Sequence, residues 1–134
     1  MVDLCDLAKS FYFHPAMKGS LSIKYVLPAV WQTNVNLRKH PLFSRYLKHD
    51  DAGNILNPYD TLPPLPIGKD GGSEADEVVK EGTGAMLVYQ EMMFGLSRNE
   101  SGAREKYRKL LLQYCELDTA AMVMIWIHWS KMTK

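Results

Sequence analysis

The sequence has little cysteine, no long uninterrupted apolar run and no excess of charge of either sign. Its two cysteines, Cys5 and Cys115, lie far apart and form no CxxC or Cys/His spacing. This argues against a structural zinc module and is typical of reduced thiols in the cytoplasm. The formal net charge is +1, from 16 Lys and Arg against 15 Asp and Glu. Binding to nucleic acid would therefore need a local basic patch rather than the charge of the whole chain.

The hydropathy pattern of the sequence also predicts no targeting segment and no membrane segment. No stretch reaches the roughly 18 apolar residues of a membrane helix. The most apolar run, residues 120–127, is closed by Asp118 on one side and by His128 and Lys131 on the other. The N-terminus lacks a basic region followed by a long apolar one, so no signal peptide is expected. These absences predict a cytoplasmic protein with no membrane partner.

The composition is that of an ordinary globular protein. The chain has 134 residues, of which 46% are hydrophobic and 23% charged. That length fits one domain with one core, so we expect a single domain over residues 1–134. There are no tandem repeats and no convincing series of strands. The sequence predicts a mainly α fold with at most one or two short strands.

Helical signals dominate the first part of the chain. Apolar residues recur at helical spacing between Asp3 and Phe13, which favours a helix over the alternative of a short strand at residues 2–4. Ser20 is placed to cap a second helix through Trp31, which Pro28 is expected to interrupt or bend. Residues 41–47 predict one or two helical turns. The sequence DDAGN at residues 50–54 then predicts a turn.

A Pro/Gly-rich stretch over residues 59–76 is typical of a long exposed loop. A loop of that length in a compact domain is functional or mobile, and we place the mobile region at residues 57–80. A helix over residues 85–93 follows, and Gly95 closes it. Ser97 and Glu100 have the spacing of a capping box for a helix over about 102–113. The last helix is expected over about 117–131.

Three segments together resemble a known family. They are HPAMKGSLSIKYVLPAV (residues 14–30), EGTGAMLVYQEMMF (81–94) and LLLQYCELDTAAMVMIWIHW (110–129). They are similar to the C-terminal half of the bacterial domain-of-unknown-function family 2779, which often accompanies RecB/Cas4-like nuclease segments and looks like a ribonuclease-H-like DEDD exonuclease. The resemblance implies that the chain is the helical C-terminal part of an α/β exonuclease fold.

The resemblance also implies a site. In such exonucleases four acidic residues hold two divalent metals, Mg²⁺ or Mn²⁺, and the last motif is a tyrosine followed four positions later by an aspartate. Tyr114 and Asp118 have that spacing, which places both on one face of a helix. Asp118 would hold a metal and Tyr114 would orient the attacking water.

The family's two earlier acidic motifs have no credible counterpart, because Asp3 and Asp6 do not stand in for them. The pair Tyr114 and Asp118 is then vestigial or needs a partner. No cofactor is expected for the chain alone, since one carboxylate cannot build a two-metal site.

Simpler interpretations of the same residues remain open. Asp118 can be the N-cap of the last helix, and the residue type alone favours that role. Tyr114 can be a half-buried amphipathic side chain. Lys18, Ser20 and Lys24 surround the predicted start of a helix, where they can bind a phosphate of a nucleic acid or simply form a capped surface helix.

The last helix is apolar on nearly every face, so other helices, a second copy or a protein partner must cover it. We therefore predict a non-catalytic exonuclease-like fragment that acts by binding protein or nucleic acid. A mobile-element-encoded inhibitor of a nuclease or CRISPR complex is one example. The alternative is the C-terminal part of a metal-dependent 3′–5′ exonuclease, which needs upstream acidic motifs in cis or in trans.

Overall fold

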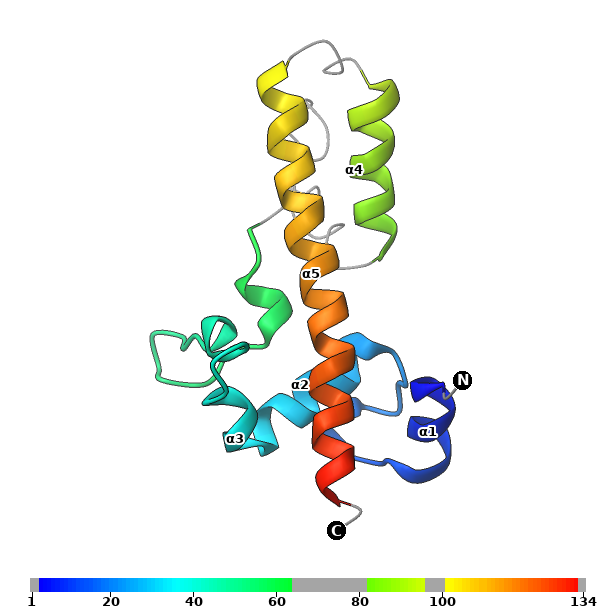
Figure 1. The fold of residues 1–134 in the computed structure, drawn as a ribbon, viewed down its shortest axis with the longest axis vertical. Coiled ribbons are helices and arrows are strands. Elements are labelled where there is room, and N and C mark those ends of the chain that lie inside the picture. Colours follow the sequence, from blue (N-terminus) through cyan, green and yellow to red (C-terminus); the bar gives the residue numbers. More distant parts are fainter. Residues whose placement is uncertain (1–2, 64–81, 96–100, 133–134) are drawn as a thin grey trace. The chain divides into compact units, whose positions relative to one another are not determined.

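The computed structural model describes residues 3–63, 82–95 and 101–132, and this part of the chain is mainly helical (Figure 1). It contains no β-strand, only an isolated bridge between His49 and Ile55. The predicted mainly α class is confirmed. Residues 1–61 and 117–134 form one compact unit, called unit 1, and residues 62–116 form a second, called unit 2. The single domain over residues 1–134 stays a prediction.

Helix α1 (Leu4–Phe11) opens unit 1 in the region where a helix was predicted. Asp3 is its N-cap, and its Oδ1 accepts a hydrogen bond of 2.7 Å from the backbone N–H of Cys5. The helix ends at Phe11, two residues before the predicted end, and the backbone of the next residue, Tyr12, is extended. A 3₁₀ turn, η1 (Pro15–Met17), follows.

Helix α2 (Ile23–Thr33) corrects two expectations. Ser22, not Ser20, occupies the N-cap position, and the Oγ of Ser20 accepts a hydrogen bond of 3.3 Å from the backbone N–H of Ser22. Pro28 does not interrupt the helix, which continues to Thr33. A proline inside a helix removes one N–H donor and crowds the carbonyl group one turn before it, but the buried residues of α2 hold the helix together on both sides of it. They are Val26, Leu27, Ala29, Val30 and Trp31.

Short turns connect α2 to the remainder of unit 1. Helix α3 (Val35–Arg38) is capped by Asn34, whose Oδ1 accepts a 3.1 Å bond from the backbone N–H of Leu37. The predicted helical turns at 41–47 appear as the 3₁₀ segment η2 (Ser44–Tyr46). The turn at 50–54 is confirmed. There the carboxylate of Asp50 accepts bonds from Ala52 N and Asn54 N, and Gly53 adopts a φ of 82°.

Unit 2 pairs helix α4 (Gly82–Phe94) with the first half of helix α5. Gly95 follows α4, as the sequence predicted. Val88 is buried, and Tyr107, Leu110 and Leu111 of α5 pack against it. The two helical segments therefore run side by side (Figure 1). The predicted capping box of Ser97 and Glu100 lies outside the described residues, as does the predicted loop from residue 64 onward.

Helix α5 (Ser101–Met132) is one helix of 32 residues, where the sequence predicted two with a break before Asp118. The break was wrong because one buried stripe runs through this point at helical spacing. It consists of Tyr114, Leu117, Ala121, Met124 and Ile125.

The length of α5 also bears on the membrane prediction. Residues Arg104–Met132 are long and apolar enough to cross a membrane by length and composition, and 28% of the most apolar window is buried. The sequence argument missed this because it divided the run at Asp118. A core helix has the same length and composition, so the absence of a membrane partner stays a prediction.

Candidate functional site

Asp118 lies in the middle of α5, not at a helix start. The N-cap interpretation, which the residue type alone favoured, is therefore wrong. An N-cap carboxylate accepts bonds from free backbone N–H groups of the first turn, and in mid-helix those groups are bonded to the preceding turn. The side chain of Asp118 must find its partner elsewhere.

That partner is Tyr59, whose hydroxyl donates a hydrogen bond of 2.7 Å to Oδ1 of Asp118. Tyr59 belongs to η3 (Pro58–Thr61), a 3₁₀ turn that the hydroxyl of Thr61 closes with a 2.7 Å bond to the carbonyl oxygen of Pro58. Pro58 is fully buried and fixes the turn in unit 1. The sequence placed Tyr59 in an exposed loop, but the structure makes it half-buried.

Lys24 of α2 adds a positive charge to this pair. Its Nζ lies 5.8 Å from the centre of the Tyr59 ring, within the range of a cation–π contact. Three elements that are distant in the sequence thus meet around one tyrosine. They bring together two residues that were predicted separately, Lys24 as a phosphate contact and Asp118 as a metal ligand. We call Lys24, Tyr59 and Asp118 the Tyr59 cluster.

The other predicted site residues have different surroundings. Tyr114 is buried one helical turn before Asp118 on α5. Lys18 is exposed and adopts the left-handed conformation at the end of η1, with a φ of 51°. Ser20 bonds to Ser22. Of the three predicted phosphate contacts, only Lys24 has a described contact within the Tyr59 cluster.

A two-metal centre does not fit the described residues by themselves. In this part of the chain no three side chains of His, Cys, Asp or Glu lie close enough together to hold an ion. Asp118 offers one carboxylate, and one of its oxygens already accepts the Tyr59 hydroxyl. A two-metal site needs several oxygen ligands, so no catalytic step is assigned to the described residues by themselves.

Comparison with known proteins adds no assignment. No family model, curated protein or solved structure matches this chain. The resemblance to family 2779 therefore stays a prediction that the three sequence segments carry. The geometry of the Tyr59 cluster stands independently of it.

The surface of α5 next to the Tyr59 cluster is apolar. Met122, Val123 and Trp126 are exposed, although the opposite face of the same turns is buried in the core. We call these three residues the α5 stripe. At 100° per residue, Asp118 lies at the border between the two faces, since Met122 is four positions and the buried Ile125 seven positions further on. A molecule that covers the α5 stripe would reach the edge on which Asp118 stands.

The sequence did not identify Tyr59 as a site residue, because Tyr59 begins a Pro/Gly-rich stretch that was predicted to be an exposed loop. A local signal was present. In NPYD an asparagine precedes a proline, which is typical of a turn, and the backbone N–H of Tyr59 bonds to Oδ1 of Asn57 at 3.2 Å. That turn fixes Tyr59, but its long-range contact with α5 has no signature in the local sequence.

Proposed function

We propose that this chain is the C-terminal, site-completing part of a metal-dependent exonuclease. It acts alone only by binding, and it presents Asp118, one helical turn after the buried Tyr114, to acidic residues that lie outside the described part of the chain. The proposal adopts the second of the two functions that the sequence left open. The observation that supports this proposal most is the position of Asp118 in mid-helix, because an aspartate there cannot serve as an N-cap.

The Tyr59 cluster supports this role through its charges. The Tyr59 hydroxyl fixes the orientation of the Asp118 carboxylate, while Lys24 places a positive charge over the tyrosine ring. A pre-oriented carboxylate and a cation that share one tyrosine as a neighbour suit a site that receives a phosphodiester, because the cation attracts the phosphate and the rigid carboxylate loses little entropy.

The α5 stripe supplies the surface for the remaining part of the enzyme. Three large apolar side chains exposed along two turns of one helix cost free energy in water. We propose that a sheet-bearing segment with the missing acidic residues packs against them, in cis or in trans. Because the α5 stripe borders Asp118, such packing brings carboxylates of that segment toward Asp118.

The exposed α5 stripe also favours a second candidate, the binding module that the sequence analysis put first. In that case the stripe docks on a nuclease or CRISPR complex and inhibits it. The two candidates make opposite predictions for the activity of the assembly. A site-completing part raises the activity of its partner, whereas an inhibitor lowers it.

The test uses the tagged chain purified from its native host with bound proteins. The assembly is assayed on 3′-labelled and 5′-labelled single-stranded DNA with Mn²⁺, beside the chain purified alone. We expect the assembly to shorten the DNA from its 3′ end and the chain alone to be inactive. Asp118→Asn should reduce the rate at least 100-fold, because metal ligation is lost while the amide oxygen still accepts the Tyr59 hydroxyl.

The matched control is Glu105→Gln, which removes an exposed carboxylate from the same helix and should leave the rate unchanged. The proposal is overturned if the assembly has no nuclease activity with Mn²⁺ or Mg²⁺, or if Asp118→Asn retains full activity. A nuclease that gains activity when the chain is removed supports the inhibitor instead. Activity of the chain alone that depends on Asp118 would show that the site is complete in one copy.

A further inference from the structure

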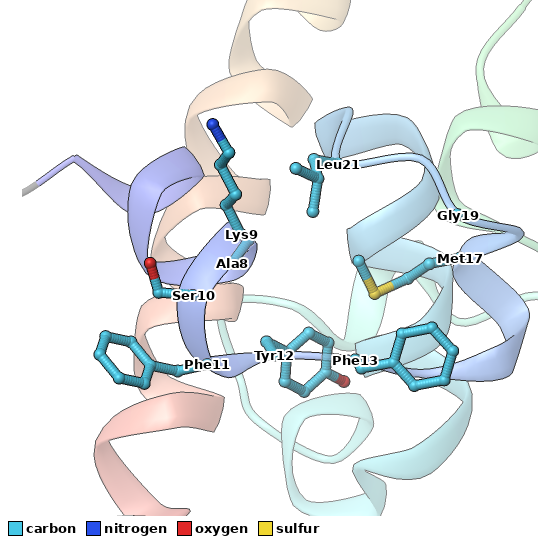
Figure 2. A pocket seen from close by; sticks show the side chains of 9 residues that line it. All are labelled: Ala8, Lys9, Ser10, Phe11, Tyr12, Phe13, Met17, Gly19 and Leu21. Atoms are coloured by element: carbon cyan, nitrogen blue, oxygen red, sulfur yellow. The ribbon is translucent and has the colours of Figure 1, made fainter.

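A pocket of about 350 Å³ lies in unit 1, and none of the residues of the Tyr59 cluster line it. Figure 2 shows the side chains that do. Residues 8–13 line it together with Met17, Gly19 and Leu21, so α1, the segment after it and η1 all contribute. This volume is at the lower end of the range of small-ligand sites. The proposed exonuclease role uses none of these residues.

Two phenylalanines at this pocket are unusually exposed. The side chains of Phe11 and Phe13 are 83% and 82% exposed, and their rings lie on either side of Tyr12 (Figure 2). Tyr12 itself is fixed from behind, because its ring packs against Trp129 with ring centres 5.3 Å apart. Single exposed aromatics are common on protein surfaces. Two that flank one pocket on a fixed backbone provide flat apolar faces for a ligand.

The charged side chain that lines this pocket is basic. Between Asp6 and Asp50 the sequence contains no acidic residue at all. The same segment contains seven basic residues, namely Lys9, Lys18, Lys24, Arg38, Lys39, Arg45 and Lys48. Lys9 is the one charged residue among those that line the pocket, and the exposed Lys18 stands between the lining residues Met17 and Gly19. A ligand with negative charge would therefore complement Lys9 and Lys18.

We infer that this pocket binds a nucleotide unit of a single-stranded nucleic acid. A base stacks on the ring of Phe11 or Phe13, and Lys9 and Lys18 attract the neighbouring phosphates. Exposed aromatic rings combined with lysines are the elements with which proteins hold single strands without reading their sequence. An acidic peptide would satisfy the lysines, but it lacks the flat rings that make use of two exposed aromatic faces.

The inference is independent of the proposed exonuclease role. It needs neither Asp118 nor a partner, so the isolated chain should bind. The probes are fluorescein-labelled ten-nucleotide oligo(dT) and oligo(U), with binding followed by fluorescence anisotropy at 50 and 200 mM NaCl. Comparison of the two probes distinguishes DNA from RNA as the source of the nucleotide.

We expect Phe11→Ala and Phe13→Ala each to weaken binding about tenfold, because each removes a stacking surface. Lys9→Gln should weaken binding and reduce the slope of log affinity against log salt by about 0.7, as expected for one lost phosphate contact on a single strand. The matched control is Phe94→Ala, which removes a 75% exposed phenylalanine from α4 and should change nothing. Far-UV circular dichroism checks that each variant is folded.

Two results would overturn the inference. One is that neither oligonucleotide binds to the folded wild-type chain at 50 mM NaCl. The other is that both phenylalanine variants bind as tightly as Phe94→Ala. Displacement of the probes by poly-glutamate at equal charge would assign the site to acidic peptides. The binding assay uses the isolated chain without metal and the nuclease assay uses the assembly with Mn²⁺, so failure here and failure of the exonuclease proposal are distinguishable.

Discussion

Helix α5 belongs to two regions that bury it very differently. In unit 1 its turns contribute Leu117, Ala121, Met124 and Ile125 to a core that also receives side chains from α1, α2 and the turns after them. In unit 2 its turns pack with α4 around Val88. Among the described residues, α5 therefore buries more side chains in unit 1 than in unit 2, and helix continuity alone does not give both ends the same stability.

All three tryptophans, Trp31, Trp126 and Trp129, lie in unit 1. Tryptophan fluorescence therefore reports the unfolding of unit 1, whereas far-UV circular dichroism reports helices in both units. If the units differ in stability, the two signals should give different urea midpoints.

The largest expected effect is that of Leu27→Ala. Leu27 is fully buried in α2, and removal of such a side chain costs about 2–5 kcal/mol of unfolding free energy. The urea midpoint measured by tryptophan fluorescence should fall accordingly. Leu42→Ala is the control, because Leu42 is 66% exposed and its loss should change stability by no more than about 0.5 kcal/mol.

The counterpart in unit 2 is Val88→Ala, which should cost about 1–2 kcal/mol from the apolar groups removed. We expect part of the circular dichroism signal to be lost at a lower urea concentration, while the urea midpoint measured by tryptophan fluorescence stays unchanged. If Val88→Ala shifts both signals equally, the two regions unfold as one cooperative unit and the comparison fails.

A smaller effect is expected at the Tyr59 cluster, which ties α5 to η3 within unit 1. Tyr59→Phe and Asp118→Ala each remove the 2.7 Å hydrogen bond, and a typical intramolecular hydrogen bond contributes about 0.5–1.5 kcal/mol to stability. In a double-mutant cycle the two changes should therefore couple by about 1 kcal/mol in the fluorescence-detected unfolding free energy.

The control for that cycle is Tyr25→Phe, which removes the hydroxyl of an exposed tyrosine on α2 and should show no coupling with Asp118→Ala. Additive effects of Tyr59→Phe and Asp118→Ala would mean that the hydrogen bond does not stabilise unit 1.

The sequence predicted the helical class, α1, α4 and the turn at residues 50–54, because each depends on neighbouring residues alone. It failed where a distant contact decides the outcome. Asp118 and Thr119 together resemble a helix start, yet the buried stripe from Tyr114 to Ile125 carries the helix through them. Ser20 has the chemistry of a cap, but the chain enters α2 two residues later.

The candidate site shows the same limit. Lys24 and Asp118 could be chosen from the sequence as charged residues near helices, and both lie in the Tyr59 cluster. Their common neighbour Tyr59 could not, since it meets Asp118 across 59 positions of sequence. Local patterns identify which residues carry charge, whereas the long-range packing of η3 and α5 decides which of them meet.

The smallest expected effect is a pH dependence that is confined to unit 1, which contains all four histidines. Burial lowers the pKa of His128, and the charge of nearby His14 lowers it further. Asn34 Oδ1 accepts the Leu37 N–H, so its amide nitrogen faces His128 Nδ1 at 3.1 Å as a donor. His128 therefore accepts at Nδ1, and protonation there would replace this bond with two opposed donors.

A histidine whose folded pKa lies below its unfolded value of about 6.5 stabilises the fold fully above that pH. The contribution is lost as the pH falls through the lowered pKa. The fluorescence-detected urea midpoint should therefore decrease between pH 7.5 and 5, and His128→Gln should flatten this decrease, whereas the exposed His49→Gln should not. Hydrogen bonds from Asn54 lower the pKa of Asp50. Titration of Asp50 therefore changes the stability only below about pH 4. If the urea midpoint of His128→Gln falls with pH as steeply as that of the wild type, His128 does not cause the pH dependence of unit 1.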